Sequence, residues 1–240
     1  MRPLLIAIPS RERPDRLEIA IGVGLALAQG DVRYHVAVDD DDPQLDAYVE
    51  LLEPWSRSGY VSWEQGPRKS LTKWTNWIAK THVQQYYAIG SFGDDHVPET
   101  DNWDTMLLAY LHEIGGTGIV YPEDFRRQDV PEAPIVTTDI IQKLGWVFLP
   151  SLHHFYPDNV LADIGSATGT LYFAEDVIVR HDHYLVANPK SPRSLYDNTY
   201  REAEYWLGQD EQTYKAWKAD RENGMASDVR KIRELLRNKT

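Results

Sequence analysis

The segment Tyr86–Pro98 reads YYAIGSFGDDHVP, an apolar run that ends in two adjacent aspartates. The run from Gln85 to Gly90 predicts a buried β-strand, and Asp94 and Asp95 follow its end. Glycine and aspartate are common in turns, so the Gly-Asp-Asp tripeptide on its own favours a solvated loop. At the carboxyl end of a strand in a parallel sheet, however, the same acids lie where ligands bind. The organisation of the rest of the chain therefore decides between a turn and a cation site.

Apolar runs earlier in the chain predict further strands, and each is followed by a polar break and a helical pattern. The predicted strands are Pro3–Ile8, Val32–Val38 and Gly59–Trp63, and the predicted helices are Asp15–Gln29, Pro43–Trp55 and Lys69–Lys80. Strands that alternate with helices imply βαβ units and a mostly parallel sheet flanked by helices. We therefore expect these polar segments to converge on one crevice at the carboxyl edge of the sheet: Pro9-Ser10, Asp39-Asp40, Gly66 to Lys69, and Asp94-Asp95.

The second part of the chain has a less regular pattern. We expect a helix from Asp104 to Ile114, then short strands with one helix near Asp158 to Ser166, and finally a helical tail from Asp197 that is divided at Gly224. Apolar residues at helical spacing over 225–236 predict that the last helix packs on the core. The predicted organisation is an α/β domain over residues 1–190 and a helical extension over residues 191–240 that packs on the same domain.

The composition limits the possible classes of protein. The chain has 240 residues, 42% of them apolar, and it contains no Cys, which excludes disulfides and thiolate chemistry. Its formal net charge of −12 opposes an extended nucleic-acid surface. No stretch reaches the roughly 20 apolar residues of a membrane span, and the N-terminal apolar run lacks a signal-peptide cleavage site. We therefore expect a soluble cytoplasmic protein without a membrane span.

Basic residues flank the same predicted crevice. In the segment GPRKSLTKWTNW, Arg68, Lys69 and Lys73 lie near the start of a predicted helix, where anions bind well. A solvated basic face is the alternative for this segment. Arg11 and Arg13 follow the first strand in PSRERPDR, where they either contact phosphate or solvate a turn. This segment has no glycine-rich phosphate loop, which disfavours P-loop NTPases and classical dinucleotide enzymes.

Two later segments carry further candidates for chemistry. Asp158 follows Pro157 at the predicted start of a helix, where it serves as a general base toward a substrate hydroxyl or as the helix N-cap, and the two roles are compatible. His181 and His183 share one face if they lie on a strand, because they are two residues apart. They are candidates for metal or phosphate contacts, with ordinary surface histidines as the alternative.

In their order and spacing, these segments resemble the nucleotide-sugar-dependent glycosyltransferases of the GT-A fold, in particular the large family-two group. The matching pieces are IAIPSRERPDRL, VAVDDDD, GPRKSLTKWTNW, GDDHVP, PDNVLADIG and RHDHY, which span most of the chain. Each motif is short, so the order of the motifs carries the resemblance. It implies a Rossmann-like GT-A domain that transfers a sugar from a nucleotide-sugar, a UDP-sugar foremost, with Mn²⁺ or Mg²⁺ as the metal.

The resemblance also implies a role for each candidate residue. Those that would contact the nucleotide or its diphosphate are Pro9, Ser10, Arg11, Arg13, Asp39, Arg68, Lys69, Lys73 and Asp94. Asp95 would bind the metal directly, and His181 or His183 would supply a later metal or diphosphate contact. Asp158 matches the acceptor-activating carboxylate of inverting members, so it would take the acceptor proton. The resemblance leaves the acceptor open among a glycan, a protein and a modified nucleic acid.

Some features depart from the family pattern, and other hypotheses compete with it. The motif is Gly-Asp-Asp-His rather than a plain Asp-any-Asp, so the motif leaves open which oxygen binds the metal. The signatures of processive polysaccharide synthases are missing, which favours a single transfer by a soluble enzyme. The alternatives are a phage-type DNA-base glycosyltransferase, a nucleotidyltransferase on a related scaffold, and a non-catalytic sugar or nucleotide binding module. The net charge counts against the first, and the lack of a glycine-rich loop in PSRERP counts against the second.

Overall fold

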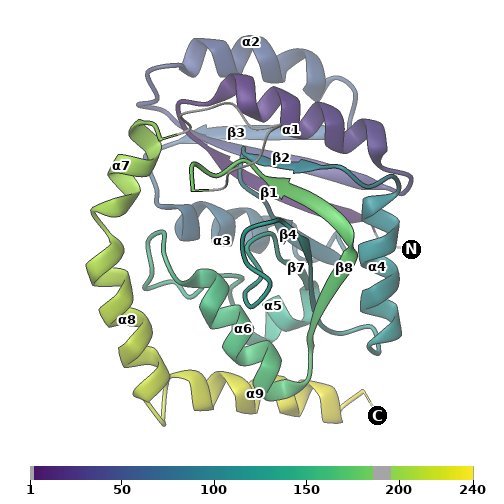
Figure 1. Ribbon diagram of the computed structural model, residues 1–240, viewed down its shortest axis with the longest axis vertical. Coiled ribbons are helices and arrows are strands. Elements are labelled where there is room, and N and C mark those ends of the chain that lie inside the picture. Colours follow the sequence, from purple (N-terminus) through teal and green to yellow (C-terminus); the bar gives the residue numbers. More distant parts are fainter. Residues whose placement is uncertain (1–2, 186–195, 240) are drawn as a thin grey trace.

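The computed structural model describes residues 3–185 and 196–239 (Figure 1). They form an eight-stranded sheet in the order β3-β2-β1-β4-β7-β6-β8-β5, covered by helices on both faces. The α/β fold expected from the sequence is therefore confirmed. The predicted boundary between residues 190 and 191 lies outside the described residues.

The first half of the sheet is entirely parallel, as the alternation of strands and helices predicts. Its strands are β1 (Leu4–Ser10), β2 (Val32–Asp39), β3 (Val61–Gly66) and β4 (Ala88–Ser91). The register pairs Ser10 with Val38, Asp39 with Gly66, and Ala7 with Ser91. The carboxyl ends of these strands therefore meet at one edge, and the polar segments that follow them are brought together there.

The second half of the sheet is mixed. Its strands are β5 (His96–Pro98), β6 (Ile119–Glu123), β7 (Ile135–Thr137) and β8 (Leu171–His181). β7 runs antiparallel to β4 and β6, and β5 runs antiparallel to β8, whereas β6 and β8 are parallel. The register between β5 and β8 places His96 opposite His181. This pairing carries the end of β8 to the acidic turn between β4 and β5.

The helices form a layer on each face of the sheet. α1 (Pro14–Leu27), α2 (Leu45–Ser56) and α4 (Trp103–Glu113) pack on one face, and α3 (Leu71–His82), α5 (Thr138–Leu144) and α6 (Pro157–Thr168) pack on the other. Alternation along β1 supplies both cores, since Leu4 and Ile6 face the first layer while Leu5 and Ala7 face the second. A strand buried on both faces reads as a continuous apolar run, which is the pattern of PLLIAI.

The helical tail comprises α7 (Asn198–Glu204), α8 (Leu207–Ala219) and α9 (Met225–Arg237). Figure 1 shows α7 and α8 along one side of the molecule and α9 crossing beneath α6. α9 buries Val229 and Ile232, and Ile232 is part of the second core, which confirms the prediction of a helix packed on the core. Gly224 separates α8 from α9, where a Cβ would lie 2.0 Å from the carbonyl oxygen of Trp217.

Several details differ from the sequence-based expectation. The helix α5 was not predicted, because its seven residues are too few for a clear helical period. β8 ends at His181, so His181 and His183 do not both lie on a strand, and the condition for a shared face is not met. The N-cap of α6 is Tyr156 and its first residue is Pro157, so the alternative that Asp158 is the N-cap is also wrong. Within the described residues, no helix is long and apolar enough to cross a membrane.

Candidate active site

A cavity of about 810 Å³ opens at the edge where the parallel strands end, within the size range of small-molecule sites. Its wall includes every site residue predicted from the sequence: Pro9, Ser10, Arg11, Arg13, Asp39, Arg68, Lys69, Lys73, Asp94, Asp95, Asp158, His181 and His183. The wall also contains residues from the tail, among them Tyr200 and Trp206. Residues far apart in the sequence are therefore gathered around one volume.

Asp39, at the end of β2, is held firmly on one side of the cavity. Its Oδ1 accepts hydrogen bonds from the indole Nε1 of Trp74 at 2.7 Å and from the backbone N–H of Lys69 at 3.0 Å. Its Oδ2 lies 3.3 Å from a guanidinium nitrogen of Arg11. Asp39 as a whole is 4% exposed, so these contacts replace the water that burial removes.

The basic side chains before and at the start of α3 are more exposed than Asp39. Ser70 is the N-cap of α3 and accepts from the backbone N–H of Lys73, so the helix begins beside the cavity as predicted. The ammonium of Lys69 lies over the ring of Trp74, 3.4 Å from its centroid. Arg68 is half-exposed and pairs with Glu202 of α7, and Lys73 is exposed.

Asp94 and Arg13 form the buried centre of the cavity wall. Asp94 accepts from Ser10 Oγ at 2.7 Å and from Arg13 Nη1 at 3.1 Å. Arg13 also donates to both oxygens of Asp197, at 2.7 and 2.8 Å. Burial raises the pKa of Asp94, an effect that Arg13 opposes and the charge of Asp95 reinforces. Arg13, which follows β1, thus links the acids of the turn between β4 and β5 to Asp197 of the tail.

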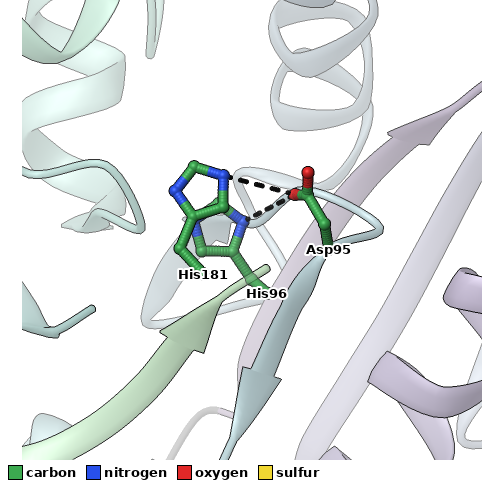
Figure 2. A group of neighbouring side chains, drawn as sticks. All are labelled: Asp95, His96 and His181. Carbon is green, nitrogen blue, oxygen red and sulfur yellow. Dashed lines mark ion pairs between the residues drawn. The ribbon is translucent and has the colours of Figure 1, made fainter. Parts of the chain in front are cut away.

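Asp95, in the turn between β4 and β5, and His181, at the end of β8, point toward each other (Figure 2). Asp95 Oδ1 lies 3.5 Å from His181 Nε2, and both side chains are buried. Burial opposes ionisation of Asp95, but the charge and hydrogen bond of His181, with His96 close by, outweigh burial and hold the pKa of Asp95 well below its usual value. Burial also acts against protonation of His181, yet Asp95 and Glu132 raise the pKa of His181 to about 9.

His96 also lies beside Asp95 and had no role in the sequence-based prediction. Its Nδ1 is 3.5 Å from Asp95 Oδ1, and its ring stacks on that of His181 with the centroids 4.1 Å apart (Figure 2). The same Nδ1 accepts a hydrogen bond from the backbone N–H of Gly93 at 2.8 Å, so its lone pair is already in use. The turn is tight, since a Cβ at Gly93 would lie 2.4 Å from Asp95 Oδ1. The sequence feature that could have indicated a role for His96 is its position directly after Asp94 and Asp95 in the GDDH motif.

Asp124, Glu132 and His181 form a second group with metal-ligand spacing. Glu132 Oε2 lies 3.0 Å from His181 Nδ1, and Glu132 Oε1 lies 2.5 Å from Arg126. Burial disfavours the charge on Glu132, but His181 and Arg126 outweigh it and lower its pKa to about 2. Asp124 caps the following turn by accepting from the backbone N–H groups of Arg126 and Arg127. Neither acid has a sequence pattern that singles it out.

His183 lies apart from both groups of potential metal ligands within the described residues. Its Nδ1 accepts from the backbone N–H of Leu185, and its ring packs against those of Tyr184 and Tyr200. Burial, together with the positive charges of Arg126 and His181, lowers the pKa of His183 to about 3, so the ring is neutral. Of the two predicted histidines, the structure brings only His181 to Asp95.

Asp158 lies in the first turn of α6, after Tyr156, which has a left-handed backbone with φ of 70°. Burial raises the pKa of Asp158 to about 6, and the negative charge of Glu132 adds to this shift. The side chain still reaches the cavity. A carboxylate with a pKa near neutrality can accept a proton and release it again at physiological pH.

The loop before α6 is held by an acid of the tail. Asp210 of α8 has no exposed surface and accepts from the backbone N–H groups of His153, His154 and Phe155 at 2.8 to 2.9 Å. The ring of His153 stacks on Trp206 with the centroids 3.8 Å apart. These contacts fix the part of the cavity wall that leads into Asp158.

The donor set around Asp95 fits a hard divalent cation. Asp95 Oδ1 and His181 Nε2 are close enough to share one ion, and both residues line an open cavity that leaves space for further oxygen ligands. Mn²⁺ and Mg²⁺ are commonly bound by one or two protein side chains together with water and phosphate oxygens. Asp94 is tied to Ser10 and Arg13, which leaves Asp95 as the acid of the pair that faces His181.

Comparison with known proteins identifies the fold. No family model and no curated protein matches the sequence. Among solved structures, the chain is similar to a mannosyltransferase from Pyrobaculum calidifontis in complex with GDP-Man and Mn²⁺, with a TM-score of 0.67, 10% identity, and 97% of this chain and 69% of that chain covered. It is also similar to S. aureus TarS in complex with UDP-GlcNAc, with a TM-score of 0.59, 10% identity, and 87% and 66% of the two chains covered. The protein therefore has the GT-A-like fold of nucleotide-sugar glycosyltransferases.

Proposed function

We propose that the protein is a metal-dependent glycosyltransferase that moves a sugar from a nucleoside diphosphate sugar, a UDP-sugar foremost, to an acceptor hydroxyl. The observation that carries this proposal is the position of the Asp95–His181 pair and of Asp158 in the wall of one cavity, with Asp39 and the basic segment before α3 on its other side. The likeness of the fold to structures solved with GDP-Man or UDP-GlcNAc supports it.

The donor nucleotide lies along the ends of β1 and β2. Asp39 is oriented by Trp74 and Lys69, so its remaining lone pairs recognise N–H groups of the base. Arg11 contacts Asp39 with its guanidinium, and Arg68 lines the same cavity. When bound at Asp95 and His181, Mn²⁺ or Mg²⁺ offsets the negative charge that develops on the departing diphosphate.

The acceptor hydroxyl lies at Asp158. Transfer proceeds through an oxocarbenium-like state, in which the sugar loses its bond to the diphosphate as the acceptor oxygen approaches. Asp158 accepts the acceptor proton in this step, and its raised pKa keeps it basic enough for the task. Attack from the face opposite the diphosphate gives inversion at the anomeric carbon.

A donor panel read by thermal unfolding tests this function. UDP together with Mn²⁺ should raise the melting temperature, because a ligand that binds only the folded state stabilises it. GDP, CDP and ADP are included, each with Mn²⁺ and with Mg²⁺, followed by an assay of donor hydrolysis. No shift with any nucleoside diphosphate across these metals would overturn the proposal. A shift without any hydrolysis or transfer would instead favour a non-catalytic binding module.

A further inference from the structure

Each of the two proposed metal ligands has a second polar atom that points away from its partner. Asp95 presents Oδ1 to His181 and has Oδ2 on its other side, and His181 presents Nε2 to Asp95 and has Nδ1 on its other side. Both second atoms are engaged by side chains that the proposed chemistry does not use. These are Tyr200, from α7 of the tail, and Glu132, which precedes β7.

The contact at Asp95 is a short hydrogen bond. The hydroxyl of Tyr200 donates a hydrogen bond to Asp95 Oδ2 at 2.7 Å. Tyr200 is buried, with 9% of its surface exposed. Arg13 approaches the same oxygen at 3.4 Å, a longer contact, because its shorter bonds go to Asp94 and Asp197. Tyr200 therefore supplies the closer contact that sets the rotation of the Asp95 carboxylate.

The contact at His181 sets the orientation of the imidazole ring. Glu132 Oε2 lies 3.0 Å from His181 Nδ1, which places the proton on Nδ1 and the free lone pair on Nε2 once the ring is neutral. The Glu132 side chain is only 6% exposed and is itself fixed by Arg126. A 180° turn of the His181 ring would break this contact and remove Nε2 from Asp95.

We propose that Tyr200 and Glu132 are positioning residues that hold Asp95 and His181 from opposite ends in the geometry of a divalent cation site. This inference rests on the proposed function, since it assumes the metal pair. It makes metal affinity depend on the tail, because Tyr200 lies 105 residues after Asp95. Partners of this kind typically change metal affinity by about 10-fold to 100-fold when removed.

The test uses the full chain and compares Tyr200→Phe and Glu132→Gln with the unaltered protein. The first removes only a hydroxyl and keeps the ring that packs on His183 and under Arg13. The second removes a charge at almost constant shape. The matched control is Tyr196→Phe, which deletes a similar hydrogen bond from an exposed tyrosine to Glu204. Binding of Mn²⁺ alone is measured by calorimetry and by the electron paramagnetic resonance signal of the free ion, and binding of UDP without metal is measured in parallel.

We expect each of the two variants to weaken Mn²⁺ binding by about 10-fold or more, with unchanged metal-free UDP binding and only a modest fall in melting temperature from the lost buried contact. Tyr196→Phe should bind Mn²⁺ as the unaltered protein does. Unchanged Mn²⁺ binding in both variants would overturn this inference while the proposed function stands. A joint fall in UDP binding and melting temperature would overturn it as well, by showing a general structural role. An unaltered protein that binds neither Mn²⁺ nor Mg²⁺, with or without UDP, would instead overturn the metal-dependent function itself.

Discussion

The two sides of the cavity are built in different ways. The side formed by the ends of β1, β2 and β4 consists of loops that directly follow strands, so each polar segment is placed by the strand before it. The opposite side depends on contacts between residues far apart in the chain, such as His181 with Glu132, 49 residues away, and His153 with Asp210, 57 residues away. The first side is a property of the parallel sheet, whereas the second needs distant segments to come together and is completed only when the tail docks. Substitutions on the two sides should therefore change different properties of the protein.

The largest effect is expected for Asp158→Asn, on the side that depends on long-range contacts. Loss of a general base lowers the turnover number by about 10²-fold to 10⁴-fold. UDP affinity and the melting temperature should stay unchanged, because Asp158 is not the N-cap of α6. Steady-state kinetics, UDP calorimetry and thermal unfolding check this. An equal loss of UDP binding and transfer would make Asp158 a structural residue.

In the Asp210→Ala variant, the loop before α6 should unfold more easily and the protein should be less stable. It leaves the backbone N–H groups of His153, His154 and Phe155 without their buried charged acceptor, which costs about 3 kcal/mol. For a chain of this size that lowers the melting temperature by about 6–12 °C. The matched control is Asp163→Ala, which removes a partly exposed ion pair with Lys218 and a hydrogen bond from Tyr214, and should cost less, about 1 kcal/mol. Equal shifts in the two variants would contradict the role given to Asp210.

Metal binding should become tighter as the pH rises. The pKa of His181 is raised to about 9, so its ring is protonated near neutrality and must lose a proton before Nε2 can bind a cation. The apparent Mn²⁺ affinity should rise by about tenfold per pH unit between about pH 6 and 8.

His183→Asn supplies the control for this pH dependence. Because His183 is already neutral, with a pKa near 3, this variant should keep both the slope and the affinity. Calorimetry across the pH range measures both proteins. If the Mn²⁺ affinity of the unaltered protein did not depend on pH, the metal contact would not belong to His181. If His183→Asn lost the pH dependence, the contact would belong to His183 instead.

The smallest effect is expected for Lys73→Ala on the sheet side. Lys73 is exposed in the first turn of α3, and solvent screens its charge. UDP affinity should change by less than about fivefold, and the difference should fade in high salt. Lys80→Ala, farther along the same helix, is the control and should have no effect. A larger loss at Lys73 would favour the anion site predicted from the sequence over a solvated face.

The difference between the two sides also explains what the sequence could predict. The strands β1, β2 and β4 are buried runs of apolar residues, and the acids that follow them were placed correctly at one edge. By contrast, β5 and β7 have three residues each, too few for any periodicity. Glu132 and Tyr200 stand in segments with no motif, and only the folded chain brings them to His181 and Asp95. A role for His96 could have been predicted from the sequence, because His96 directly follows Asp94 and Asp95.

The network around Arg13 has a consequence for the order in which the chain assembles. Asp197 lies 184 residues after Arg13, so their ion pair cannot form until most of the chain has emerged during synthesis. Before that, Asp94 and Asp95 are already available to the same guanidinium through the early parallel strands. Because contacts between distant residues form late, the β1–β4 half should be established before α7 closes over it. The cavity would thus acquire its last wall only in the final step of folding.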